Sequence, residues 1–176
     1  MLDAAKSHFQ LFGLESSFNL DRKRLEEAYR ALQAEVHPDK SAHLADSEQR
    51  LAMQRSTLVN EAYQTLKSPI RRARYLLALN GIDTQEETNT AMPVDFLMSQ
   101  MEWREAVADA QKRRDVAALD RLASGMKQDT ARLEESLAVK IDEDRDYEGA
   151  ALLVRKLRFM EKLAEEIGSA YDEIDN

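Results

Sequence analysis

The chain has 176 residues, of which 43% are hydrophobic and 33% are charged, and its formal net charge is −8. This balance is sufficient to bury a core and excludes disorder along the whole chain. The absence of Cys excludes disulfides and any metal or cluster held by thiolates. With only 5 Gly and 3 Pro among many strong helix formers, the composition predicts an all-α fold.

A short apolar cluster around Gly13 begins the chain, and an extended segment through Phe18 and Leu20 follows it. The cluster includes Phe9 and Phe12. We expect these two rings to pack across the helices that follow, because a hairpin of two helices buries little surface by itself.

Two patterned segments follow, and each predicts an amphipathic helix. Asp21 is a candidate N-cap for the first helix, whose apolar stripe is Leu25, Tyr29, Leu32 and Val36. The second helix is expected to begin near Asp46 or Ser47 and to end at Ser68-Pro69. Its apolar stripe comprises Leu51, Leu58, Val59, Ala62, Tyr63 and Leu66.

The tetrapeptide His37-Pro38-Asp39-Lys40 separates these two helices. Pro38 disfavours helical backbone at His37 and has no N–H group to continue the helix. The tetrapeptide should therefore lie at the tip of an antiparallel helix pair. As an isolated motif, this sequence is equally consistent with an ordinary helix stop.

A further helix is predicted from Ile70 to Leu79, with Asn80-Gly81 as its C-terminal cap. Residues 81–92 are polar and aperiodic, so we expect a first domain of residues 1–80, a linker of 81–92 and a second domain of 93–176. The net charge is −1 for residues 1–92 and −7 for the remainder. Such an acidic second half argues against nucleic acid and anionic membranes as partners.

The second domain reads as three helices: Pro93 to about Lys112, Val116 to about Ile141, and about Asp146 to Asp172. The last two contain apolar seams, which predict a left-handed three-helix bundle. In the middle helix the seam is Leu119, Leu122, Met126, Leu133 and Leu137, and in the last helix it is Leu153, Leu157, Met160, Ala164, Ile167, Tyr171 and Ile174.

The helix after Pro93 has two apolar faces, which is more than a bundle seam requires. At about 100° per residue, one face comprises Phe96, Trp103, Val107 and Ala110 and suits the core. The other face grades from apolar to acidic, which is typical of a binding surface. It comprises Leu97, Met98, Met101, Glu102, Glu105 and Asp109. Packing of its apolar part against the first domain is an equally good interpretation.

Phe159 lies off the seam of the last helix, with Leu152 and Leu163 as neighbours on its face. An aromatic side chain at such a position can anchor a protein partner. It can equally seal the flank of the bundle, and the periodicity does not distinguish the two roles.

Residues 8–80 resemble a J-domain, the module by which DnaJ-type co-chaperones stimulate ATP hydrolysis by a DnaK-type chaperone. The resemblance rests on Ala28-Tyr29-Arg30, the tripeptide His37-Pro38-Asp39, and the run from Asn60 to Pro69 followed by Arg72 and Tyr75. It implies a short first helix and a chaperone-binding surface that includes His37, Pro38, Asp39, Lys40, Arg24 and Arg30. Glu35, where that pattern often has Lys, favours a specialised chaperone partner.

The whole chain is similar to the HscB family of J-type co-chaperones of iron–sulfur cluster biogenesis. This similarity rests on three segments: Arg72 to Leu77 with Gly81, Phe96 to Glu105, and Val154 to Phe159. It implies stimulation of an HscA-like ATPase and delivery to it of an IscU-like scaffold protein. It also places scaffold binding on Leu97, Met98, Met101, Glu102, Glu105, Asp109 and Phe159, with Met101 and Asp109 departing mildly from the family pattern.

Other classes of function are also compatible with parts of this sequence. A J-domain co-chaperone for a different client, or a helical adaptor that does not stimulate ATP hydrolysis, would share these patterns. A helical enzyme using Asp142, Glu143 and Asp144 is less favoured, because such a run usually solvates a helix end. His37, Asp39 and His43 make a poor metal site because a proline interrupts them. We therefore expect no enzyme activity, metal or cofactor.

The absence of a basic segment followed by an apolar run, and of any long apolar stretch, predicts a cytoplasmic protein without a membrane partner. We also expect it to be a monomer.

Overall fold

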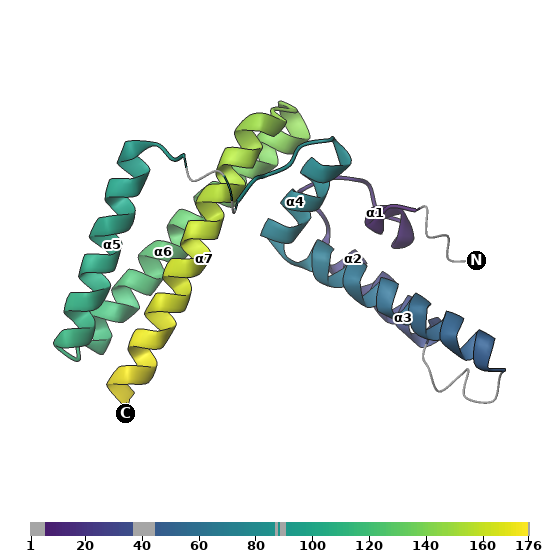
Figure 1. Ribbon diagram of the computed structural model, residues 1–176, viewed down its shortest axis with the longest axis horizontal. Helices are drawn as coiled ribbons and strands as arrows, with labels where there is room; N and C mark the ends of the chain where they lie inside the picture. The colour runs from purple at the N-terminus through teal and green to yellow at the C-terminus, as the bar shows by residue number, and fades with distance from the viewer. Residues whose placement is uncertain (1–5, 37–44, 87, 89–90, 176) are drawn as a thin grey trace. The chain divides into compact units, whose positions relative to one another are not determined.

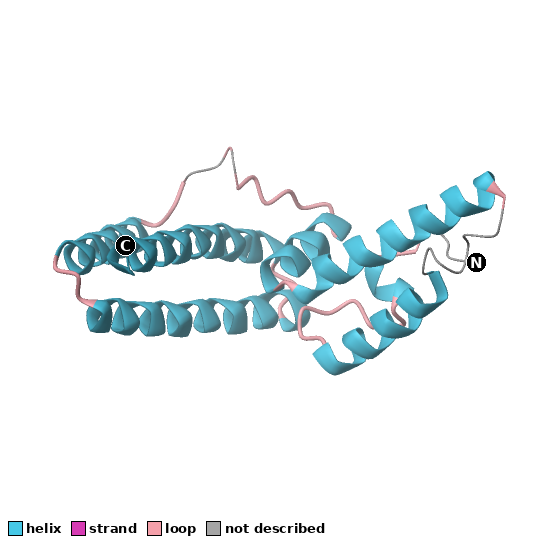
Figure 2. Ribbon diagram, turned by 90° about the horizontal axis from the view of Figure 1, so that it is seen from below, coloured by secondary structure: helices cyan, strands magenta, loops and turns pink. Residues whose placement is uncertain are grey.

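The computed structural model describes residues 6–36, 45–86, 88 and 91–175. Within these residues it consists of helices joined by loops, without a strand (Figure 2). The predicted all-α class is therefore confirmed. The chain divides into two compact units, Met1–Leu76 and Leu77–Asn176.

The N-terminal unit is built on a helical hairpin. It contains α1 (His8–Leu11), α2 (Arg22–Val36), α3 (Asp46–Lys67) and the first part of α4 (Pro69–Leu79). Both α1 and α2 pack against α3 (Figure 1). Phe9 and Phe12 are buried, as predicted, because the hairpin alone offers too little apolar cover.

The stripe predicted for α3 is wrong at Leu51, which is 46% exposed. Tyr29 of α2 stacks on Tyr63 of α3 with ring centroids 3.9 Å apart, and this contact sets the alignment of the two helices. From there α2 continues only about two turns, to Val36, whereas Leu51 lies more than three turns before Tyr63. Leu51 is therefore beyond the end of its partner helix.

Local hydrogen bonds explain where several helices begin and end. The Asp21 carboxylate accepts from the backbone amides of Lys23 and Arg24, at 2.9 and 3.1 Å, which confirms Asp21 as a cap. After α4, Gly81 has φ +76° and the Ile82 amide donates to the Leu77 carbonyl over 2.9 Å. This is the predicted left-handed C-terminal cap.

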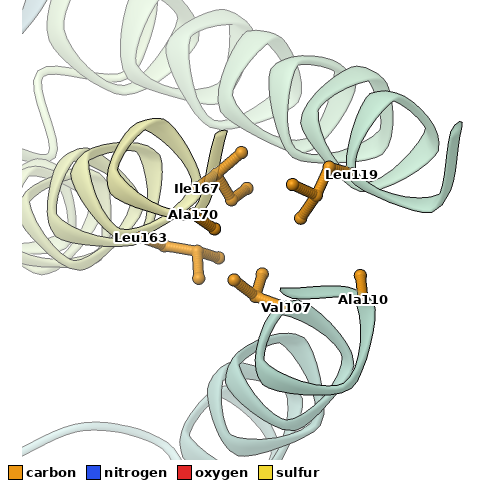
Figure 3. Close-up of a cluster of buried hydrophobic side chains, with 6 residues drawn as sticks. All are labelled: Val107, Ala110, Leu119, Leu163, Ile167 and Ala170. Carbon is orange, nitrogen blue, oxygen red and sulfur yellow. The ribbon is translucent and has the colours of Figure 1, made fainter. Parts of the chain in front are cut away.

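The C-terminal unit contains a three-helix bundle of α5 (Val94–Lys112), α6 (Val116–Ala138) and α7 (Tyr147–Asp175), as predicted. Each helix packs against the other two. Short connections make α6 antiparallel to both neighbours, so α5 and α7 run parallel (Figure 1). Figure 3 shows a core cluster to which all three helices contribute, formed by Val107, Ala110, Leu119, Leu163, Ile167 and Ala170.

The predicted seam of α7 needs one correction. Ala164 is exposed, whereas Leu163 is fully buried in the core cluster. Because α7 packs against both α5 and α6, its buried arc is wider than a two-helix seam. An α-helix also drifts by about 20° per heptad from a strict seven-residue repeat. Leu163 therefore belongs to the core and not to the flank that was expected beside Phe159.

Two details of the bundle were not apparent from the periodicity. A Cβ atom added to Gly125 of α6 would lie 2.9 Å from the Trp103 ring, so this glycine makes room for the indole. Helix α6 also continues into a π-helical turn, η2 (Val139–Glu143), so the helical segment ends two residues after the predicted end near Ile141. Pro93 occupies the N-cap position of α5, and the helix begins at Val94, one residue later than predicted.

Candidate functional site

The outward face of α5 carries three exposed apolar side chains in its N-terminal half. Leu97, Met98 and Met101 are 36%, 57% and 70% exposed. The opposite side of the helix is held in the bundle by Val107 and Ala110, which are buried. The three apolar side chains therefore lie outside the bundle core, on the surface of the C-terminal unit.

Acidic side chains continue this face toward the C-terminal end of α5. Glu102, Glu105 and Asp109 are all exposed. Asp109 forms an exposed ion pair with Arg113 at 3.6 Å, one turn further along the helix. Six of the predicted scaffold-binding residues thus share one face of α5, in the order expected from helix geometry.

Phe159, the seventh predicted residue, is half-buried on α7. Its ring meets that of Phe96 edge-on, with centroids 6.0 Å apart and planes at 88°. Lys156 lies over the Phe96 ring, its Nζ 5.2 Å from the centroid. Phe159 therefore packs against the first turn of α5. Its partner there, Phe96, is the residue before Leu97.

Two residues of this region were missed by sequence reasoning. Gln100 is 2% exposed, and its Nε2 donates to the Met160 Sδ over 3.4 Å. Lys156 is half-buried on Phe96. The position of Gln100 on the predicted core side of α5 could have indicated that this polar residue is buried. Nothing in the sequence could have indicated the role of Lys156, because it depends on a contact between two helices.

The predicted chaperone-binding residues of α2, Arg24 and Arg30, are both exposed. Arg30 forms an ion pair with Glu26 at 3.5 Å within the same helix. Such an exposed pair is weak and leaves the guanidinium accessible. His37, Pro38, Asp39 and Lys40 lie outside the described residues, as does His43.

A cluster of polar groups lies at the end of the helical segment that begins with α6. Asp142 and Glu143 belong to the π-helical turn, and Asp144 follows it directly. Nearby, a hydrogen bond from Lys140 lowers the pKa of Asp146 and raises that of Lys140. In the described part of the chain, no group of His, Asp and Glu is arranged to hold a metal ion. None of the helices described there has both the length and the apolar character needed to cross a bilayer.

In the N-terminal unit, His8 stacks on Tyr75 with ring centroids 4.2 Å apart. Burial lowers the pKa of His8, and the charge of Glu61 opposes this shift. The Tyr75 hydroxyl also accepts a hydrogen bond from the His8 backbone amide at 2.9 Å. These contacts fasten α1 to α4.

Two family models match this chain, one in each half. The DnaJ domain matches residues 7–75, and the model described as the HSCB C-terminal oligomerisation domain matches residues 92–168. The fold and these two matches define the chain as a co-chaperone with a J-domain.

Full-length relatives identify the family. The chain is 45% identical to a "Co-chaperone protein HscB homolog" of Azoarcus sp. (strain BH72), over 99% of each chain. Among solved structures it is similar to chaperone HscB from Vibrio cholerae, with 35% identity and a TM-score of 0.85 over 96% of this chain and 99% of that one. The human co-chaperone HscB gives 32% identity and a TM-score of 0.88 over 94% of this chain and 82% of that one. The chain belongs to the HscB family.

Proposed function

We propose that this protein stimulates ATP hydrolysis by a DnaK-type, HscA-like chaperone and delivers to it an IscU-like scaffold protein, for the maturation of iron–sulfur proteins. Membership of the HscB family supports the assignment to iron–sulfur protein maturation. The observation that carries scaffold binding is the exposed face of α5, on which Leu97, Met98 and Met101 lead into acidic side chains.

The scaffold would bind mainly by burial of this apolar face. Leu97, Met98 and Met101 offer partly exposed apolar surface, and the flexible thioether side chains of the two methionines adapt to an irregular partner. The carboxylates of Glu102 and Glu105 would orient a basic part of the scaffold and accelerate its association. Phe159 completes the surface from α7, next to the start of α5.

The chaperone would bind through the N-terminal unit. The matched DnaJ domain and the exposed guanidinium groups of Arg24 and Arg30 support this role. In this proposal His37, Pro38, Asp39 and Lys40 also contact the chaperone and promote ATP hydrolysis. The protein itself would supply no catalytic group for that reaction.

A tethering mechanism follows from two binding surfaces on one chain. We place the J-domain in residues 1–80, a linker in 81–92 and the scaffold-binding bundle in 93–176. A scaffold held on the bundle reaches the chaperone at a high effective concentration, so selectivity does not require a deep pocket. In this proposal one protein molecule, acting as a cytoplasmic monomer, serves both contacts.

The test is the steady-state ATPase rate of an HscA-type chaperone as this protein is added, with and without an IscU-type scaffold. We expect each addition to raise the rate, and both together to raise it more than the two separate effects combined. Stimulation that is indifferent to the scaffold would contradict the proposed client. No stimulation under any condition would leave a helical adaptor.

A further inference from the structure

The proposed scaffold-binding surface is divided between two helices that are far apart in sequence. Leu97, Met98 and Met101 lie on α5, and Phe159 lies on α7. A scaffold that touches both needs them at one spacing, and that spacing depends on the register of α5 against α7. The inference below therefore rests on the proposed function, and it concerns what holds that register.

Four polar contacts join α5, or Arg114 just after its end, to α7, and they share one register. Gln100 pairs with Met160, Arg104 with Glu166, Gln111 with Glu173, and the Arg114 side chain with the Ile174 carbonyl. The partners are separated by 60, 62, 62 and 60 residues respectively. A slip of one helical turn, about 5.4 Å, would break all of these contacts together.

Gln100 is the buried member of this series, and it is poorly satisfied. Its Nε2 donates to a thioether sulfur, a weak acceptor, and its Oε1 has no hydrogen-bond partner among the described residues. An apolar residue of the same shape would avoid the cost of this buried oxygen. Buried polar residues that reduce stability are best attested where they select one helix register over another. Gln100 fits that role, because it is buried on α5 and its side-chain hydrogen bond reaches Met160 on α7.

Arg104 and Glu166 form an exposed contact of the series. The Arg104 Nε donates to both carboxylate oxygens, at 3.0 and 3.1 Å. Both side chains are about 40% exposed, so the pair adds little to global stability. Unlike the pair between Arg113 and Asp109, which lies within one helix, it joins two helices and therefore has a preferred register.

We propose that Gln100 and Arg104 are positioning residues: they hold α5 in one register against α7 and so set the spacing between the apolar face of α5 and Phe159. Neither residue needs to touch the scaffold. Their effect on scaffold binding would pass through the geometry of the other side chains.

A charge exchange tests the role of Arg104. Arg104→Glu and Glu166→Arg each place like charges together, and each should weaken binding of an IscU-type scaffold by about fivefold. The double variant restores an opposite-charge pair without a change in net charge, and we expect it to recover most of the affinity. Arg132→Glu, which breaks an exposed pair with Asp129 within α6, is the control for charge alone.

Gln100→Met tests the buried position with a readout that a purely structural role would not produce. Met has nearly the same shape but carries no unsatisfied amide oxygen. We expect the midpoint of thermal unfolding to stay or to rise, while scaffold affinity falls by about fivefold, the equivalent of one hydrogen bond. Stability and binding would then change in opposite directions.

Calorimetric titration of the full chain with the scaffold, alongside circular dichroism of each variant, gives the decision. Recovery in the charge exchange together with weaker binding by a stable Gln100→Met variant supports the inference. A double variant that binds as weakly as Arg104→Glu would mean that Arg104 contacts the scaffold directly, and unchanged affinity of Gln100→Met would remove the role of Gln100; either overturns it. Failure of the unmodified protein to bind is a distinct result, which overturns the proposed function and this inference with it.

Discussion

Replacement of Met101 by Ala should weaken scaffold binding while leaving the fold intact. Met101 is 70% exposed on α5, so most of its surface stays in water until a partner covers it. The side chain contributes little to the bundle core for the same reason. Met53, which is 64% exposed on α3 of the N-terminal unit, provides a matched control of the same residue type.

The expected loss follows from the surface that remains to be buried. Complete burial of a Met or Leu side chain stabilises by about 2 kcal/mol. Scaling by the exposed fractions of 70%, 57% and 36% gives about 1.4 kcal/mol for Met101, about 1.1 for Met98 and about 0.7 for Leu97. In affinity these correspond to losses of about tenfold, sixfold and threefold.

Calorimetric titration of an IscU-type scaffold into each Ala variant measures these losses, and chemical unfolding shows whether the bundle is retained. Met53→Ala should bind the scaffold as the unmodified protein does. Equal affinity for Met101→Ala and the unmodified protein would refute the proposed surface. A reversed order, with Leu97→Ala the weakest binder, would refute the argument from exposed area even if the surface itself is correct.

Three further outcomes are expected. Asp39→Asn should abolish stimulation of the chaperone ATPase with little change in unfolding midpoint, and equal stimulation by variant and parent would refute the J-domain role. Gly125→Ala should lower the free energy of unfolding by about 1 kcal/mol, because overpacking against Trp103 costs about 1–3 kcal/mol and the higher helix propensity of Ala returns about 1 kcal/mol. Trp103 is the only tryptophan in the sequence, so the fluorescence spectrum should shift in this variant. An unaltered spectrum would contradict the contact between Gly125 and the indole. The hydrogen bond from Lys140 lowers the pKa of Asp146 below 3.8, so this bond stabilises the fold above pH 3.8 and the stabilisation is lost as the pH falls through the lowered pKa. An NMR titration should show a higher pKa for Asp146 in Lys140→Met than in the unmodified protein. An unchanged pKa would exclude Lys140 as the cause of the shift.

Helix boundaries were predictable because they depend on neighbours in sequence. Asp21 caps α2 through amides two and three residues away, and Gly81 ends α4 with a left-handed backbone. The exposed face of α5 was predictable for a similar reason, since helix geometry alone separates Met101 from Val107. These features need no knowledge of where any other helix lies.

Predictions that depended on a partner helix were less accurate. The stripe on α3 included Leu51, but α2 ends before it can cover that residue. The seam on α7 included Ala164, but contact with two helices moved burial to Leu163. Periodicity shows which side chains share a face, and it does not show how far a neighbouring helix extends or from which directions it packs.

By itself the sequence determined the helical class, the ends of most helices and the face of α5 that carries Met98 and Met101, because backbone propensity, capping and helical spacing act over a few residues. Only the tertiary structure decided which side chains meet between helices. The pairing of Phe159 with Phe96, the burial of Gln100 and the ion pair between Arg104 and Glu166 all depend on the register of α5 against α7. That register is set by the simultaneous packing of residues about 60 positions apart, which no local pattern encodes.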